Sequence, residues 1–385
     1  MTAPLARPTL AAVVTRHAEA CVEQFGMTLS QRKVCRAIRA CRTAALGGQL
    51  IACEDCGSSR YVYHSCRNRH CPRCQTRAKE RWIDARVSEL LPVPYFHRVF
   101  TLPHSLHRLL PQQTRWLYDT LFRCVAQTLL AFGRDPARLN GTLGITRVLH
   151  TWAQDLSRHL HVHGGVTGGA LTADGQWVGA RPTFLFPVRA LSKVFRGKYL
   201  EALIEAQETG AFHDSAWTED PTQGSAFVAE LRKPEWVVYA KPPFGGPEQV
   251  LAYLGRYTHR IAISDPRLIE VNDERVRFRV RRGSDRSERR VLTLPGAEFL
   301  HRYLQHVLPP GFQRLRHYGL TASRCKQAKL ALCRQQLQVP APASKPLETV
   351  EAFWLRIARI DLHRCPDCGG CLTIMARLPP ARGPP

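Results

Sequence analysis

The stretch RHLHVHGGVTGGAL, residues 158–171, places histidines at 159, 161 and 163 and follows them with two Gly-Gly pairs. Alternation with a period of two predicts a β-strand, because successive side chains of a strand point to opposite faces of its sheet. His159, His161 and His163 then share one face, and the apolar residues between them share the other. This arrangement is expected of a strand that holds a metal ion. The alternative is an exposed edge strand with incidental histidines.

The glycines of this stretch are poor strand formers. Glycine inside a strand marks a bulge or a place where a ligand approaches the backbone closely. Gly164, Gly165, Gly168 and Gly169 therefore predict such an approach directly beside the histidines.

The charge of the chain indicates a polyanionic partner. The 385 residues include 55 Lys and Arg against 31 Asp and Glu, a formal net charge of +24. Such a surplus favours nucleic acid over a membrane surface as the partner. No apolar run approaches 18 residues and the N-terminus does not resemble a signal peptide, so we expect a cytoplasmic, nucleoid-associated protein with no membrane contact.

Fourteen cysteines without a secretory signal favour reduced thiols and metal sites over disulfides. Two Cys-x2-Cys pairs separated by fourteen residues predict one structural, closed zinc site, because each pair supplies two thiolates to a tetrahedral ion. The predicted ligands are Cys53, Cys56, Cys71 and Cys74, with Cys66 or His70 able to replace one of them. The arginines around them make this segment basic, so DNA is its expected contact.

The C-terminal tail repeats half of this pattern in HRCPDCGGC. Cys365, Cys368 and Cys371 can hold a metal only with a fourth ligand, for which His363 is the nearest candidate. An unstructured tail with free thiols is the equal alternative.

A hairpin is predicted in ERVRFRVRRGSDRSERRVLTL, with GSD as its turn. Arg277, Arg279 and Arg281 alternate with apolar residues, so guanidinium groups occupy one face. A strand that follows a phosphate backbone is favoured slightly over an edge strand whose charges block aggregation.

The stretch AYLGRYTHR spaces Tyr253 and Tyr257 four residues apart, which places both phenols on one face of a helix. Such pairs are more often packing residues than nucleophiles. The flanking Arg256, His259 and Arg260 are polar, however, and phenol attack on a phosphodiester needs a metal of the kind that the histidine strand predicts.

Together these motifs resemble a known family. His161-Val162-His163 matches the His-hydrophobic-His motif of HUH endonucleases, and Tyr253-x3-Tyr257 matches the two-tyrosine signature of their rolling-circle transposases. The whole chain resembles a transposase of the ninety-one family of bacterial insertion sequences, with CRTAALGG, SCRNRHCPRCQ, LHTW, YLGRYTHRIAIS and LRHYG in the expected order. Leu160 stands where members commonly carry proline, which leaves the strand more regular.

The resemblance implies an α+β fold, in which an HUH endonuclease domain with a central antiparallel sheet flanked by helices follows a helical zinc-binding domain. We accordingly expect a basic zinc- and DNA-binding domain over residues 1–92, a catalytic domain over 93–338, and a linker and cysteine-containing tail over 339–385.

The resemblance also implies the chemistry. His161 and His163 would hold Mg²⁺ or Mn²⁺, with His159 or His259 as third ligand. Tyr253 or Tyr257 would attack single-stranded DNA at the element ends and target, giving a 5′-phosphotyrosine and a free 3′-hydroxyl. The glycines would let a DNA strand close on the metal, and the candidate DNA contacts are Arg256, Arg260, Arg277, Arg279 and Arg281.

Two other functions fit parts of the sequence. A plasmid replication initiator or relaxase uses the same nicking chemistry, and a zinc-dependent DNA-binding regulator would need no active site. The basic zinc segment and the paired tyrosines favour the transposase, and the intact histidines and tyrosines argue against an inactive regulator.

Overall fold

The computed structural model describes residues 7–110, 112–212, 221–241, 249–250, 255, 262–281, 289–340 and 348–381. Within these ranges, no helix has both the length and the apolar character needed to cross a membrane. The predicted tyrosines at 253 and 257, the arginines at 256 and 260, and His259 lie outside the described residues.

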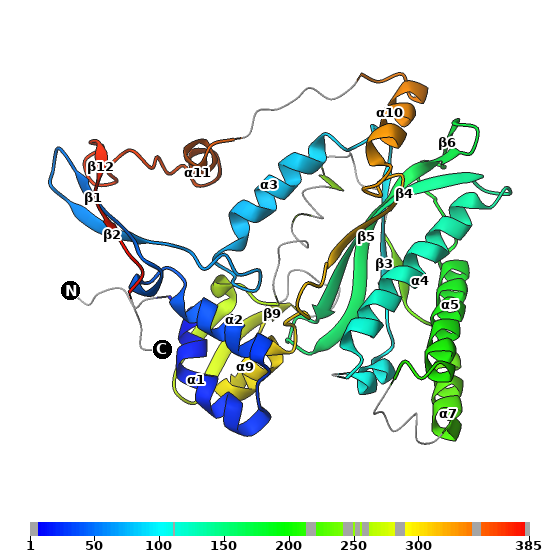
Figure 1. Ribbon diagram of the computed structural model, residues 1–385, viewed down its shortest axis with the longest axis horizontal. Helices are drawn as coiled ribbons and strands as arrows, with labels where there is room; N and C mark the ends of the chain where they lie inside the picture. Colours follow the sequence, from blue (N-terminus) through cyan, green and yellow to red (C-terminus); the bar gives the residue numbers. More distant parts are fainter. Residues whose placement is uncertain are drawn as a thin grey trace.

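The described helices and strands run in the following order along the chain (Figure 1). The first half contains α1 (Leu10–Phe25), α2 (Leu29–Ala40), β1 (Gly48–Cys53), β2 (Ser59–Tyr63), α3 (Gln75–Val87), β3 (Tyr95–Thr101), α4 (Thr114–Arg134), β4 (Gly141–Trp152), β5 (Arg158–Thr172) and β6 (Trp177–Gly179). The second half contains α5 (Val188–Glu208), α7 (Pro221–Arg232), β7 (Val238–Ala240), β8 (Leu268–Val271), β9 (Arg275–Arg281), β10 (Arg289–Pro295), α9 (Gly296–Leu304), β11 (Leu315–Gly319), α10 (Lys326–Gln336), α11 (Val350–Ala358) and β12 (Leu372–Leu378).

A central antiparallel sheet has the strand order β11-β4-β5-β3-β7, with β6 paired to β5. The histidine stretch is its middle strand β5, as the alternation predicts, and the α+β fold with a helix-flanked antiparallel sheet is confirmed. The same stretch is not an edge strand, because β4 and β3 pair with it on either side.

The two faces of this sheet have different partners. Leu160, Val162 and Val166 of β5 are fully buried in the main hydrophobic core, which α4, α5 and α7 close. Figure 1 shows these helices together on one side of the sheet and α3 on the other. Residues of the other face include His161, His163 and, on β4, His150, so we call it the histidine face.

A second core joins parts of the chain that the sequence assigned to different domains. Val13 and Val14 of α1 are buried with Phe299 and Leu300 of α9, and with Phe278 of β9. The helices α1 and α2 thus pack on the three-stranded sheet β10-β9-β8 and on α9. The predicted boundary at residue 92 is therefore not a packing boundary, because α1 and α2 find their apolar partners within residues 262–304.

The C-terminal tail also departs from prediction. Strand β12 pairs antiparallel with β1, and β1 pairs with β2, in a third sheet of order β12-β1-β2. The end of the chain therefore belongs to the same small sheet as residues 48–63, and residues 339–385 do not form a separate tail.

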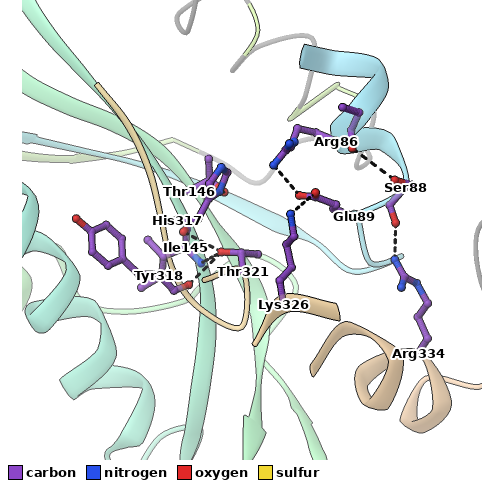
Figure 2. A network of polar contacts seen from close by, with 11 residues as sticks. Arg86, Ser88, Glu89, Ile145, Thr146, His317, Tyr318, Thr321, Lys326 and Arg334 are labelled. Atoms are coloured by element: carbon purple, nitrogen blue, oxygen red, sulfur yellow. Dashed lines mark hydrogen bonds and ion pairs between the residues drawn. The ribbon is translucent and has the colours of Figure 1, made fainter. Parts of the chain in front are cut away.

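Helix α3 is fixed at its C-terminal end by a polar network (Figure 2). Arg86 binds Glu89 at 3.2 Å, and Glu89 also pairs with Lys326 at the start of α10. Arg334 of α10 donates a hydrogen bond to the carbonyl of Ser88 at 2.6 Å. Figure 2 shows Arg86, Glu89 and Lys326 pointing toward one another beside His317 and Thr146 of the sheet. The network holds α3 over the histidine face.

The glycines of β5 serve packing within the sheet. A Cβ atom on Gly164 would lie 2.1 Å from the Thr146 carbonyl oxygen and 2.6 Å from Cδ of Arg147. The side chain of Arg147 is fully buried, and its Nη1 donates to the Arg98 carbonyl at 2.8 Å. A Cβ on Gly169 would meet the Trp177 ring at 2.3 Å. At these two positions the Thr146 backbone and the Arg147 and Trp177 side chains take the space, so Gly164 and Gly169 do not admit DNA. The same interpretation for Gly165, which lies on the histidine face, stays a prediction.

We expect Gly164→Ala to destabilise the protein by about 2 kcal/mol or more, because neither the Thr146 backbone nor the buried Arg147 can move away cheaply. Gly197→Ala is the matched control, since a Cβ there meets nothing within 4 Å and the residue lies in helix α5. It should stabilise the protein by roughly 0.5–1 kcal/mol. Urea unfolding of the two variants measures both effects, and equal midpoints would contradict the packing role of Gly164.

Candidate metal centre and zinc-binding domain

Three histidines of the histidine face form a candidate metal centre. One ring nitrogen from each of His150, His161 and His163 lies within 4.8 Å of the others. The antiparallel register produces this group, because β4 places His150 directly opposite His161 of β5. The ring centroids of His150 and His163 are 4.6 Å apart, and those of His161 and His163 are 4.7 Å apart.

Hydrogen bonds orient two of these rings. Nδ1 of His161 donates to the carbonyl oxygen of His159 at 2.8 Å, which leaves Nε2 of His161 as its free donor atom. Nδ1 of His163 shares a hydrogen bond of 3.2 Å with Nε2 of His97 from β3. An outer partner of this kind fixes the tautomer and direction of a metal-binding imidazole. No sequence motif pointed to His97, whose contact with His163 comes from the pairing of β3 with β5.

Burial favours the neutral form of the imidazoles of His161, His163 and His97. It lowers the pKa of His161 to about 3, and lowers that of His163 well below its usual value, with the neighbouring histidines adding to the effect. The pKa of His97 falls to about 3, mainly through burial and then through the charge of Arg147. A neutral imidazole presents the lone pair that a metal ion needs, without competition from a proton.

Of the two predicted third ligands, His259 lies outside the described residues and only His159 can be compared with the group. His159 lies outside the group, while His150 of the neighbouring strand belongs to it. His159 is on the same strand face but its ring faces His104, with centroids 5.7 Å apart. The LHTW motif at the end of β4 contains His150. Pairing the two predicted strands antiparallel would have suggested this histidine, because it lies opposite His161.

Two described residues, Val250 and Gly255, neighbour Tyr253 and Tyr257 in sequence. Val250 lines a pocket with Thr146 and Gly165, and Gly165 follows His163 by two residues on the histidine face. Gly255 packs directly on α3, because a Cβ there would lie 2.5 Å from Cδ1 of Ile83.

Two described tyrosines, Tyr318 and Tyr239, lie on opposite faces of the central sheet. Tyr318 of β11 packs against the main core, on the face opposite the histidines, and burial raises its pKa. Tyr239 of β7 shares the histidine face, since it pairs with Val99, which in turn pairs with His163. It is 53% exposed and is therefore a rival nucleophile among the described residues.

The arginine hairpin is present as β9 and β10, with apolar residues buried between the arginines. Arg277 forms an ion pair with Glu270 at 2.9 Å, and Arg279 donates to the Pro266 carbonyl at 3.1 Å. Arg281 is exposed. Of the five predicted DNA contacts, three lie on this hairpin, and two of those three have partners within the protein.

The cysteines form two groups of four where the sequence predicted one site. The first group consists of Cys41, Cys66, Cys71 and Cys74, and the second of Cys53, Cys56, Cys365 and Cys368. The predicted set is therefore split, because β1 and β2 carry Cys53 and Cys56 toward the C-terminal tail. Cys66 is a full member of the first group, and Cys41, which ends α2, was missed. His70 and His363 belong to neither group.

The first group has the spacing of a zinc site. Four thiolates about 2.3 Å from a tetrahedral ion lie about 3.8 Å apart. Sγ of Cys74 lies 3.5 Å from Sγ of Cys41 and 3.6 Å from Sγ of Cys66. Helix α3 begins immediately after Cys74, so the positive end of its dipole faces the thiolates. The group ties the end of α2 to the start of α3.

Comparisons with known proteins agree with this arrangement. A family model described as a transposase zinc-binding domain matches residues 13–102, and one described as a putative transposase matches residues 144–329. No solved structure matches the chain significantly.

Two curated relatives cover nearly the whole length. A putative transposase, y4qJ, from Sinorhizobium fredii (strain NBRC 101917 / NGR234) is 43% identical over 377 residues, 95% of each chain. The transposase for insertion sequence element IS801 from Pseudomonas savastanoi pv. phaseolicola is 26% identical over 368 residues, 93% of this chain and 86% of that protein.

The zinc-binding domain and the catalytic-domain match define the class as a DNA transposase that contains structural zinc. The chain belongs to the IS91 family of transposases, whose N-terminal zinc-binding domain it carries.

We expect His150→Ala to weaken Mn²⁺ binding by roughly a hundredfold or more, since removing even an outer partner of a ligand costs about 10–100-fold. The matched control is His159→Ala, which removes a neighbouring imidazole of the same face that supplies no ligand atom to the group and keeps the backbone carbonyl that His161 contacts, so it should cost much less affinity than His150→Ala. Calorimetric Mn²⁺ titration of the zinc-loaded full chain makes the comparison. A greater loss in the His159 variant would restore the original ligand prediction.

Proposed function

We propose that the chain nicks single-stranded DNA at its element ends and target and transfers the strand through 5′-phosphotyrosine intermediates, in transposition of the rolling-circle type. The observation that carries this proposal is the group of three histidines on the sheet face against which Val250 lies, three residues before Tyr253.

The residues present fit a divalent metal. Three imidazole nitrogens form part of a coordination shell, and phosphate and water oxygens would complete it. Imidazole suits Mn²⁺ better than Mg²⁺, which prefers oxygen ligands. His150, His161 and His163 would therefore hold Mn²⁺ in preference to Mg²⁺ at equal concentration. When bound, the ion polarises the scissile phosphate and offsets the charge that develops on it.

The covalent steps belong to the tyrosines. The phenolic oxygen of Tyr253 or Tyr257 attacks the scissile phosphorus, the bond from phosphorus to the 3′-oxygen breaks, and that oxygen leaves with a proton as a free 3′-hydroxyl. The 5′-phosphate stays on the tyrosine, so the energy of the phosphodiester is kept for the joining step. A second phenol permits a second cleavage while the first strand is still attached.

Basic residues would bind the remaining DNA phosphates. The net charge of +24 supplies attraction independent of sequence. Arg281 is exposed for this role. Arg256 and Arg260, which neighbour the tyrosines in sequence, would join it. Arg277 would have to exchange Glu270 for a phosphate, so we expect it to contribute less.

We expect Tyr253→Phe and Tyr257→Phe each to retain a covalent DNA adduct but to fail in complete strand transfer, and the double variant to form no adduct. Removing a hydroxyl changes shape little, which separates chemistry from packing. The substrate is 3′-end-labelled single-stranded DNA from the two flanks of the gene, with Mn²⁺, and the readout is label that stays with the protein in SDS.

Tyr239→Phe and Tyr318→Phe are the matched controls for this experiment. Tyr239 shares the histidine face and Tyr318 lies on the opposite one, and both variants should form the adduct at the parental level. Peptide mapping should find the phosphotyrosine at residue 253 or 257. Adduct on Tyr239, or none with the parental protein, would overturn the proposal.

A compensating pair of variants tests whether the contact of Gly255 with α3 positions the tyrosines. Gly255→Ala forces a Cβ against Ile83, and a resulting displacement that costs about 1–2 kcal/mol slows nicking roughly five- to thirtyfold. Ile83→Ala removes the obstructing atoms, so the double variant should recover most of the lost rate. Initial nicking rates of the four proteins decide the matter, and additive losses would contradict the role of this contact.

A further inference from the structure

The second group of cysteines draws two members from each end of the chain. Cys53 is the last residue of strand β1 and Cys56 follows it, while Cys365 and Cys368 precede strand β12. Cys56 and Cys365 are 309 positions apart in sequence. The family model for the zinc-binding domain ends at residue 102, so it contains only half of this group.

The sulfur atoms are spaced for a shared metal ion. Sγ of Cys53 lies 3.4 Å from Sγ of Cys368, and Sγ of Cys56 lies 3.8 Å from Sγ of Cys365. A tetrahedral tetrathiolate site has edges of about 3.8 Å, whereas a disulfide brings its sulfurs to about 2.05 Å. All four sulfurs lie within 4.8 Å of one another. The group thus matches a closed metal site and not two crosslinks.

The backbone around these cysteines is built as two facing turns. The Gly57 amide donates to the Cys53 carbonyl at 3.1 Å, and the Gly369 amide donates to the Cys365 carbonyl at 2.9 Å. The Gly370 amide also donates to Sγ of Cys368 at 3.4 Å. Each Cys-x2-Cys pair is therefore held in a tight loop, and an amide directed at sulfur stabilises a thiolate.

Strand pairing brings the two turns together. Cys53 pairs with Leu372 in the β1–β12 register, and the Glu54 amide donates to the Cys371 carbonyl at 3.0 Å. Cys371 itself lies outside the group. It provides an internal control because it is an exposed cysteine three residues from Cys368.

We propose that Cys53, Cys56, Cys365 and Cys368 bind a second structural Zn²⁺, which fastens the C-terminal end of the chain to the N-terminal zinc-binding domain. The binding energy of a structural zinc is folding energy, and here it acts on two segments that are distant in sequence. The tail is then a component of the zinc module, and β12 is kept as the edge strand of its sheet. The proposal does not depend on the nicking chemistry.

Metal counting on the purified full chain tests the proposal. The parental protein should contain two Zn²⁺ per chain, and Cys365→Ser/Cys368→Ser should contain one. Cys53→Ser/Cys56→Ser should lose the same ion, so combining all four substitutions should still leave one. Cys371→Ser should keep two. Cys41→Ser should lose the ion of the other group and retain this one.

Hydrogen exchange supplies a readout of the tail itself. The amides of residues 372–378 should be protected in the parental protein and in Cys371→Ser, and should lose protection in both paired variants. If Cys53→Ser/Cys56→Ser fails to fold, the tail pair still gives the metal count, because it lies outside both family-model matches. One zinc in the parental protein, two in Cys365→Ser/Cys368→Ser, or a disulfide between Cys53 and Cys368 would overturn the proposal.

Discussion

The antiparallel register of β4 with β5 is the constraint on which the metal centre depends. It places His150 opposite His161, and a slip of one residue would turn every side chain of one strand to the other face. A slip of two would put Val162 or Val166 where Gly164 lies, and neither leaves room for the buried Arg147 beneath it. The Gly164–Arg147 contact therefore selects, from inside the main core, the register that assembles the histidines on the opposite face.

The two faces of the central sheet differ in character: one packs in the main hydrophobic core and the other carries the candidate metal centre. The apolar face is closed by α4, α5 and α7, whereas the histidine face is covered by α3, which comes from the zinc-binding domain. Helix α3 is held at its start by the thiolates of Cys41, Cys66, Cys71 and Cys74, and at its end by Glu89 and Lys326. The zinc domain thus contributes a wall of the candidate site, and Ile83 of that wall contacts Gly255.

The local patterns of the sequence predicted the elements well, and the errors concern pairing at a distance. Period-two alternation identified β5 and the faces of its histidines, because it depends only on neighbouring residues. Membership of the histidine group depends on the register between two strands, so proximity in sequence pointed to His159 or His259 and did not reveal His150. The predicted grouping of the zinc ligands differs from the structure for the same reason. The two Cys-x2-Cys pairs predicted one site because they are close in sequence, whereas Cys53 and Cys56 lie with Cys365 and Cys368. Composition alone could not show this, since the partners of each pair are fixed only by tertiary contacts.

The electrostatics of the site suggest how metal and DNA depend on each other. Among the described residues, the group contains three imidazoles and no carboxylate, so it offers an incoming cation no compensating negative charge. Positive charge from Lys241 also acts on His163, and Arg147 acts on His97. A divalent cation is therefore bound at an electrostatic disadvantage until an anion arrives.

A DNA phosphate supplies both the missing charge and the oxygen ligands that Mn²⁺ and Mg²⁺ favour. Since linkage is reciprocal, a phosphate that strengthens metal binding is itself bound more tightly in the presence of the metal. If the histidine group holds a divalent cation as proposed, such a centre would become complete only with a DNA phosphate bound, which would limit the proposed chemistry to the moment when a strand is in place.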